Sequence, residues 1–306
     1  MRATELAKRV FDGPYLNLKR FNQAVRDTAA NCGLEVYSYP LIYGSETAEL
    51  LGVVSNYQTG GRVFIQTSGF HGNETAPFLS TVVNLPALAR CARGLGVGIK
   101  VYPLVNPLGA AAATRYSPQD NKMGVPNGDF MRYYMADGRV LDDLGEEESF
   151  IRWAWADEVE EYLPPETRQL SSLLRAEVKK SRIVGLMDNH ADLKAGDLAT
   201  DLDCPAMYAY VFRPPQRYFS LMNRAQRTSG VPPWQEKPVS TEIPSGLKTD
   251  NRGIILDRHD ASFIDLAHRL GIEAITIEVS GDTPLDQAAQ VYRIWSLGFL
   301  GLVARG

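Results

Sequence analysis

Two histidines and a glutamate have the residue types and the spacing of a metal site. His71 and Glu74 form an HxxE pair that directly follows an apolar segment, at the predicted start of a helix. Side chains three residues apart on a helix share one face and can converge. His190 follows a second apolar segment, and two His with one Glu can hold a catalytic zinc ion with one coordination position open. The three residues are therefore candidate zinc ligands, although the HxxE pair alone also fits a packed histidine beside a helix-start carboxylate.

A fourth candidate is a charged residue inside an apolar run. Glu278 lies near the end of EAITIEV at 273–279, and buried glutamates are rare without a partner or a function. We therefore interpret Glu278 as a functional residue. Asp188 and Asp192 flank His190. Each could hold the His190 ring with its carboxylate, and each fits an ordinary loop position equally well. The remaining histidines are expected at the surface or in packing contacts: His259 and His268.

Short apolar runs that alternate with amphipathic segments must position these side chains. The runs predict buried strands at 63–69, 99–105, 182–188 and 273–279, and two further strands at 34–39 and 49–55 around a turn at Gly44-Ser45. Helical patterns occur at 17–31, 75–91, 146–162, 165–181, 215–228, 261–270 and 284–304. This alternation predicts one α/β domain over 1–306, with a central mixed, mostly parallel sheet flanked by helices. Such sheets collect functional loops at the carboxyl ends of their strands, and the candidates lie at predicted strand ends.

Two long stretches carry little regular patterning. They cover about 106–145 and 192–260, and they are rich in Gly, Pro and polar residues. Long loops in compact chains are usually functional or mobile. Both stretches are therefore expected to be largely irregular and to shape a pocket.

Composition excludes several classes of function. The 306 residues include 32 Lys plus Arg and 36 Asp plus Glu, for a net charge of −4, so a basic surface for nucleic acid is not expected. Three cysteines with no close pair predict reduced thiols and a cytoplasmic protein. The first twenty residues contain no continuous apolar core, so a signal peptide is not expected, and no apolar run of about 18 residues occurs, so no membrane association is expected. The sequence also lacks GxSxG, GxxxxGK[ST] and HExxH.

An ordered set of short motifs resembles a known family. FHGNETAP, NPLG, a Thr-Arg pair, GDxxR, NHAD and ITIEV follow one another between about 63 and 282. The set resembles the zinc carboxypeptidase superfamily, and HGNE is similar to its succinylglutamate desuccinylase/aspartoacylase branch. The resemblance implies a three-layer sandwich of the zinc-carboxypeptidase type, a phosphorylase/hydrolase-like fold.

The resemblance also implies a role for each matching residue. One Zn²⁺ per chain would be bound by His71, Glu74 and His190. Glu278 would be the general base and acid, and Arg115 would polarise the scissile carbonyl. The other two matches would support the site: Asp129, which would hold the His71 ring, and Arg132, which would bind a substrate carboxylate.

Two departures from the family pattern bear on the substrate. Met131 stands where the family has Asn before Arg132, and no Tyr lies between Tyr218 and Tyr292, where the carboxypeptidases have one about twenty residues before the base. We therefore expect a zinc-dependent hydrolase that uses metal-activated water to cleave an amide bond of an N-acyl amino acid or small peptide-like substrate bearing a carboxylate. The alternatives are a metallocarboxypeptidase or peptide amidase for small peptides, and a non-catalytic metal- or ligand-binding relative. A homo-oligomer is left open.

Overall fold

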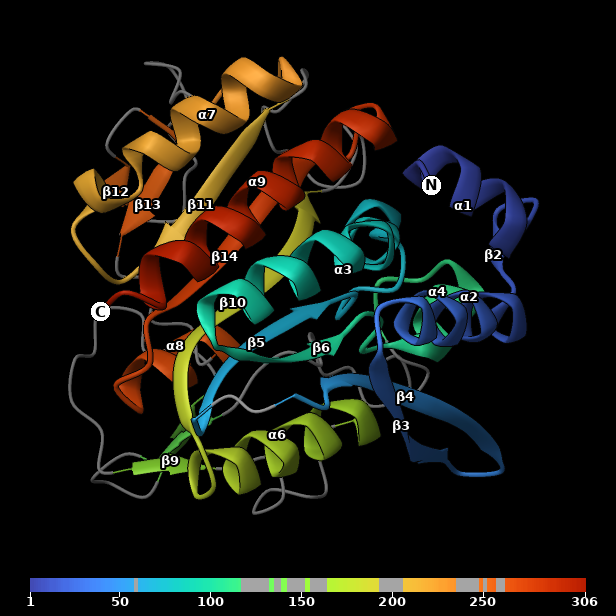
Figure 1. Cartoon of the computed structure of the whole chain (residues 1–306). Coiled ribbons are helices and arrows are strands. Elements are labelled where there is room, and N and C mark those ends of the chain that lie inside the picture. Colours follow the sequence, from blue (N-terminus) through green and yellow to red (C-terminus); the bar gives the residue numbers. More distant parts are fainter. Residues whose placement is uncertain are drawn as a thin grey trace.

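A mixed sheet runs through the centre of the molecule (Figure 1). The computed structural model describes residues 1–57, 60–116, 132–134, 139–141, 152–154, 164–192, 206–234, 248–249, 252–256 and 262–306. Within them, nine strands form the sheet in the order β12-β13-β11-β14-β10-β5-β6-β4-β3. Their bounds are β3 Leu34–Tyr43, β4 Glu46–Ser55, β5 Arg62–Ser68, β6 Gly98–Tyr102, β10 Arg182–Asp192, β11 Met207–Val211, β12 Lys248–Thr249, β13 Ile254–Leu256 and β14 Ala274–Ser280.

The parallel part of the sheet is its centre. Strands β14, β10, β5 and β6 are parallel neighbours, and all four were expected from their apolar runs. The expectation of a mixed sheet is confirmed, but four of the eight strand pairings are parallel, which is half and not most of them. The difference arises because β3 and β4 form a hairpin through Gly44 and because β11 runs antiparallel to β14.

Helices cover both faces of the sheet and complete three layers (Figure 1). One face packs against α1 Ala3–Val10, α2 Leu18–Asn31, α3 Thr75–Leu95, α7 Phe219–Ser229 and α9 Leu285–Val303. The other packs against α6 Pro165–Val178 and α8 Phe263–Arg269. Large side chains of α9, such as Trp295 and Phe299, are fully buried. Burial of a large apolar side chain stabilises the folded state by about 1.5–3 kcal/mol. No helix in the described ranges is long and apolar enough to cross a membrane.

The stretches expected to be irregular contain regular elements. The first includes α4 Pro107–Ala112, β7 Arg132–Tyr134 and β8 Val140–Leu141, and the second includes β11, the short helix η2 Pro215–Arg217, β12 and β13. The second also contains α7, which confirms the helix expected over 215–228. Residues 152–154 form β9 Arg152–Ala154, which pairs with β7, so the helix expected over 146–162 is wrong there. Strands of two to five residues form because a neighbouring strand pairs with them, and the local sequence pattern does not reveal which segment that neighbour is. A two-residue pair, β1 Phe11–Asp12 and β2 Tyr15–Leu16, completes the described strands.

Candidate metal centre

His71 reaches the site through a tight turn at the carboxyl end of β5. Gly69 has φ +71°, a left-handed conformation that turns the chain out of the strand. Gly72 lies so close to α4 that a Cβ built on it would be 2.1 Å from the carbonyl carbon of Gly109. Any larger residue at position 72 would push the two segments apart, which explains why glycine follows the histidine.

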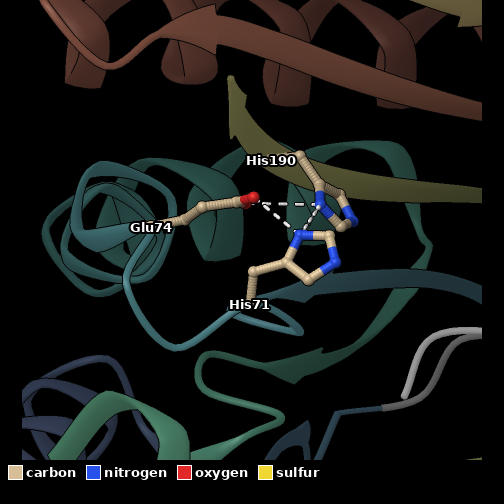
Figure 2. Close-up of side chains that lie close together, drawn as sticks. All are labelled: His71, Glu74 and His190. Atoms are coloured by element: carbon tan, nitrogen blue, oxygen red, sulfur yellow. Dashed lines mark hydrogen bonds and ion pairs between the residues drawn. The ribbon is translucent and has the colours of Figure 1, made fainter. Parts of the chain in front are cut away.

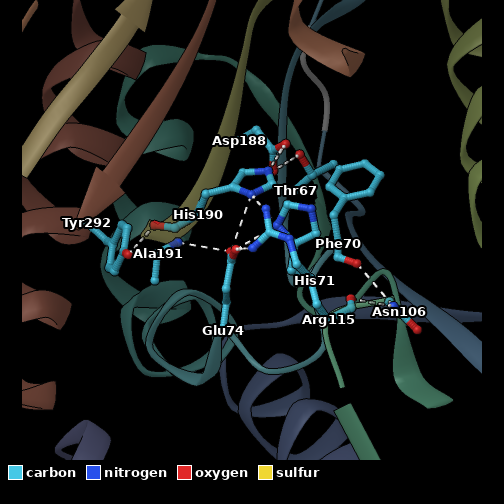
Figure 3. A network of polar contacts seen from close by, with 10 residues as sticks. All are labelled: Thr67, Phe70, His71, Glu74, Asn106, Arg115, Asp188, His190, Ala191 and Tyr292. Carbon is cyan, nitrogen blue, oxygen red and sulfur yellow. Dashed lines mark hydrogen bonds and ion pairs between the residues drawn. The ribbon is translucent and has the colours of Figure 1, made fainter. Parts of the chain in front are cut away.

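The NPLG motif at 106–109 stabilises this turn through hydrogen bonds. Asn106 caps the N-terminus of α4, where its Oδ1 accepts a hydrogen bond from the Gly109 N–H at 2.8 Å. The same side chain donates through Nδ2 to the backbone carbonyl of Phe70 at 3.1 Å, and the backbone N–H of Asn106 donates to the carbonyl of Gly69 at 2.8 Å. One asparagine therefore joins the start of α4 to the segment that carries His71 (Figure 3).

The three predicted ligands converge in the structure (Figure 2). His71 Nδ1 lies 2.6 Å from Glu74 Oε1, and His190 Nδ1 lies 3.3 Å from both His71 Nδ1 and Glu74 Oε2. All three side chains are buried, and one ligand atom from each falls within 4.8 Å of the others. Glu74 stands at the N-cap position of α3, so the turn and the helix start bring the HxxE pair together.

His190 lies on β10 itself and not after it. The strand was expected to end at 188, but it continues to Asp192 because β14 pairs with it that far. Asp188 and His190 therefore point to the same face of the sheet. Asp188 Oδ2 lies 2.8 Å from His190 Nε2, and Asp188 Oδ1 accepts a hydrogen bond from Thr67 Oγ1 at 2.7 Å. Phe70 stacks parallel to the His190 ring, at 6.0 Å between centroids.

The local charges show that this donor set suits a cation. Burial alone would raise the pKa of the Glu74 carboxyl, but the His71 and His190 imidazoles outweigh it and hold that pKa well below its usual range. Burial alone would lower the pKa of His190, but the Asp188 and Glu74 carboxylates outweigh it and raise that pKa well above its ordinary value. If His190 is neutral with its proton on Nε2 toward Asp188, its Nδ1 lone pair faces a Glu74 oxygen. Either a proton or a metal ion on Nδ1 removes this conflict, and two imidazole nitrogens with one carboxylate fit zinc.

Glu278 lies beside this group of ligands. In the sheet register Glu278 of β14 is paired with His190 of β10 on one side and with Tyr208 of β11 on the other. Paired residues project to the same face, so Glu278 is on the ligand side and is half-buried there. Burial raises the pKa of Tyr292, and the negative charges of Glu278 and Glu74 raise it further.

Two arginines and an aspartate were also predicted to belong to the site. Arg115 does: its Nη1 lies 3.0 Å from Glu74 Oε1, and its backbone carbonyl accepts from the Gly72 N–H at 3.1 Å. The backbone of Arg132 lies in β7, whereas its side chain falls outside the described residues. Asp129 and His259 also fall outside them. His268 stacks on Phe212 at 4.3 Å, in the packing role expected for it.

Two contacts were not anticipated from the sequence. Thr67 holds Asp188, and the Tyr292 hydroxyl donates to the backbone carbonyl of His190 at 2.5 Å (Figure 3). Thr67 belongs to an apolar run and Tyr292 to an apolar helix, so neither stands out in a linear pattern. Only the strand register and the packing of α9 place them at the site.

The comparisons with known proteins concern the fold. No protein-family profile and no curated protein sequence matches the chain. Among solved structures, a proposed metallopeptidase from Shewanella amazonensis is 21% identical, with a TM-score of 0.64, over 95% of this chain and 94% of that one. A second, from Shewanella denitrificans, is 20% identical with a TM-score of 0.63, over 94% and 91% of the two chains. A metallo-carboxypeptidase from Burkholderia cenocepacia is 14% identical with a TM-score of 0.54, over 95% and 70%. The chain therefore has the α/β fold of these metallopeptidase structures.

Proposed function

We propose that the protein is a zinc-dependent hydrolase that cleaves an amide bond in an N-acyl amino acid or a similarly small substrate. One observation carries the proposal: the half-buried Glu278 stands next to His190 in the sheet, on the same face as the converging His71, Glu74 and His190. A carboxylate beside a three-ligand metal site is the arrangement that metal-assisted hydrolysis needs. The fold shared with metallopeptidase structures supports this reading.

Each residue has a defined task in this proposal. When bound, zinc would supply a Lewis acid and lower the pKa of water at the open position. The Glu278 carboxylate would take the proton of the attacking water and return it to the leaving amine. Arg115 would stabilise the negative charge that develops on the carbonyl oxygen. Arg132 would bind the substrate carboxylate with its two-pronged guanidinium.

Peptides are the second candidate class of substrate. The likeness in fold to a metallo-carboxypeptidase favours them. The absence of a tyrosine between Tyr218 and Tyr292 in the sequence favours acyl amino acids. We place the enzyme in the cytoplasm, where free thiols such as Cys32 and Cys91 remain reduced.

The test uses the zinc-loaded protein and two panels of substrates. One panel contains N-acetyl and N-succinyl amino acids, and the other contains N-blocked dipeptides with a free C-terminus. Glu278→Gln, prepared in the same way, measures the background from contaminating enzymes. Release of amino acid from the first panel by wild type alone supports the proposal. Cleavage confined to the dipeptides would establish the carboxypeptidase alternative, and equal rates for wild type and Glu278→Gln would leave a non-catalytic metal-binding protein.

A further inference from the structure

The peptide group between His190 and Ala191 is bonded on both sides (Figure 3). Its carbonyl oxygen lies 2.5 Å from the hydroxyl oxygen of Tyr292, and a carbonyl has no hydrogen, so the phenol is the donor. Its N–H, which belongs to Ala191, donates to Glu74 Oε2 at 3.0 Å. The peptide therefore stands between a buried tyrosine and a predicted metal ligand.

These contacts form one continuous chain of hydrogen bonds. In a trans peptide the C=O and the N–H point in opposite directions, so the bonds run from Tyr292 through the peptide to Glu74. Tyr292 is 0% exposed and Glu74 is 4% exposed. In a buried environment such bonds polarise one another, and donation to the carbonyl strengthens the N–H as a donor.

The position of the peptide in the sheet explains why its N–H donates a hydrogen bond to Glu74. Strand β5 is paired with β10 only as far as Ser68 and Asn189, and the chain then turns away at Gly69. Past that point the N–H of Ala191 bonds the Glu74 carboxylate in place of a ladder partner. The end of one strand thus provides a backbone donor for a side chain at the start of α3.

The hydroxyl of Tyr292 is hard to explain by packing alone. The side chain belongs to the apolar cluster that α9 forms with the sheet, together with Ala288, Val291 and Trp295. Phenylalanine would fill nearly the same space, and a buried hydroxyl is costly unless it is hydrogen-bonded. Its partner is the carbonyl of a predicted ligand residue.

We propose that Tyr292 is a positioning residue for the metal centre, which fixes Glu74 through the His190–Ala191 peptide and so increases the affinity for the metal. The inference rests on the zinc site of the proposed function but not on its substrate. Partners that orient metal ligands change metal affinity by about 10- to 100-fold when removed. Because Tyr292 acts through a peptide, we expect the lower end of that range, about tenfold.

The test compares Tyr292→Phe with a matched control, Tyr218→Phe. Tyr218 belongs to the same apolar cluster and is also 0% exposed, and its hydroxyl bonds Glu273, which precedes β14 at the end opposite Glu278. Zinc affinity is measured by competition with a chromophoric chelator at fixed pH. We expect both variants to lower the melting temperature of the metal-free protein, and only Tyr292→Phe to weaken zinc binding. Equal zinc affinities in the two variants would overturn the inference.

A second readout checks the route through the peptide. The amide proton resonance of Ala191 reports the strength of its bond to Glu74, and we expect it to move upfield in Tyr292→Phe and to stay in place in Tyr218→Phe. Weaker zinc binding with an unchanged Ala191 resonance would contradict the route. Neither readout depends on turnover, so a wild type that binds zinc but cleaves no amide would remove the proposed function and leave this inference standing.

Discussion

His190 and Glu278 are paired in the parallel register of β10 and β14, and their side chains project to the same face of the sheet. A predicted metal ligand and a predicted base are thereby held on two central strands and not on loops. Side chains on packed strands keep their positions within narrow limits, which catalysis requires. Their relative position is fixed before any substrate binds.

Glu278→Gln should keep the metal and lose the reaction. The amide has the shape of the carboxylate but cannot accept the proton of the attacking water, so kcat should fall by about 10²- to 10⁴-fold. Zinc content, measured by elemental analysis, should remain at the wild-type level because Glu278 is not among the converging ligands. Glu273→Gln is the matched control, since Glu273 precedes β14 at its other end and bonds Arg217. A Glu278→Gln enzyme as active as the control would exclude the proposed base.

Asp188→Asn should loosen the metal. The carboxylate orients the His190 ring and makes it a better ligand, and loss of such a partner weakens metal binding by about 10- to 100-fold. Thr67→Val removes only the donor to Asp188 and should have a smaller effect in the same direction. Asp265→Asn, a buried aspartate that bonds Arg269 on α8, is the control. Competition with a chelator measures the zinc affinity of each variant. Equal affinities for Asp188→Asn and Asp265→Asn would contradict the role of Asp188 in orienting His190.

Zinc binding should release a proton from His190. The pKa of His190 in the metal-free protein is raised well above its ordinary value, so below that raised pKa the ligand is protonated and zinc must displace about one proton. Affinity should therefore fall about tenfold for each unit that the pH is lowered. Titration calorimetry in two buffers of different ionisation enthalpy measures the proton count. A count near zero at pH 6 would show that His190 is already neutral.

The same shift predicts how stability depends on pH. A folded-state pKa above the unfolded value of about 6.5 stabilises the metal-free fold fully below pH 6.5, and the contribution is lost as the pH rises through the folded pKa. The melting temperature of the metal-free protein should decline over that range. Asp188→Asn should reduce the decline because it removes one of the charges that raise the pKa. An equally steep decline in Asp188→Asn would show that the titration of a group other than His190 causes the decline.

Arg132→Ala should act on substrate binding. The predicted contact with a substrate carboxylate would be lost, so KM should rise by about 10-fold or more while kcat changes little. Arg217→Ala removes an exposed ion pair with Glu273 and serves as the control. An unchanged KM for carboxylate-bearing substrates would remove Arg132 from the substrate site.

The sequence was sufficient for those parts of the structure that depend on local patterns. The apolar runs located β5, β6, β10 and β14, and the three residues predicted as ligands from the HxxE pair and His190 do converge. Glu278 stood out because a charge interrupts an apolar strand. Each of these predictions depends on information within one short segment. That information is either a polar residue beside an apolar run or the apolar pattern of a single strand or helix.

Other features depend on contacts between distant segments. The extension of β10 to Asp192 requires β14 as a partner, and β11 enters the sheet only by pairing with β13 and β14. Tyr292 and Thr67 reach the ligands through packing and register. Linear patterns do not carry this information, because a Tyr on an apolar helix and a Thr in a strand are equally suited to plain core positions.

The metal content of the purified, tag-free protein tests the central claim most directly. Elemental analysis should find about one zinc per wild-type chain after supply of zinc and dialysis, and almost none in His190→Ala. His268→Ala, which removes a ring stacked on Phe212, should retain the wild-type content. A wild type that holds no metal, or a His190→Ala variant that holds as much as His268→Ala, would contradict the site built from His71, Glu74 and His190.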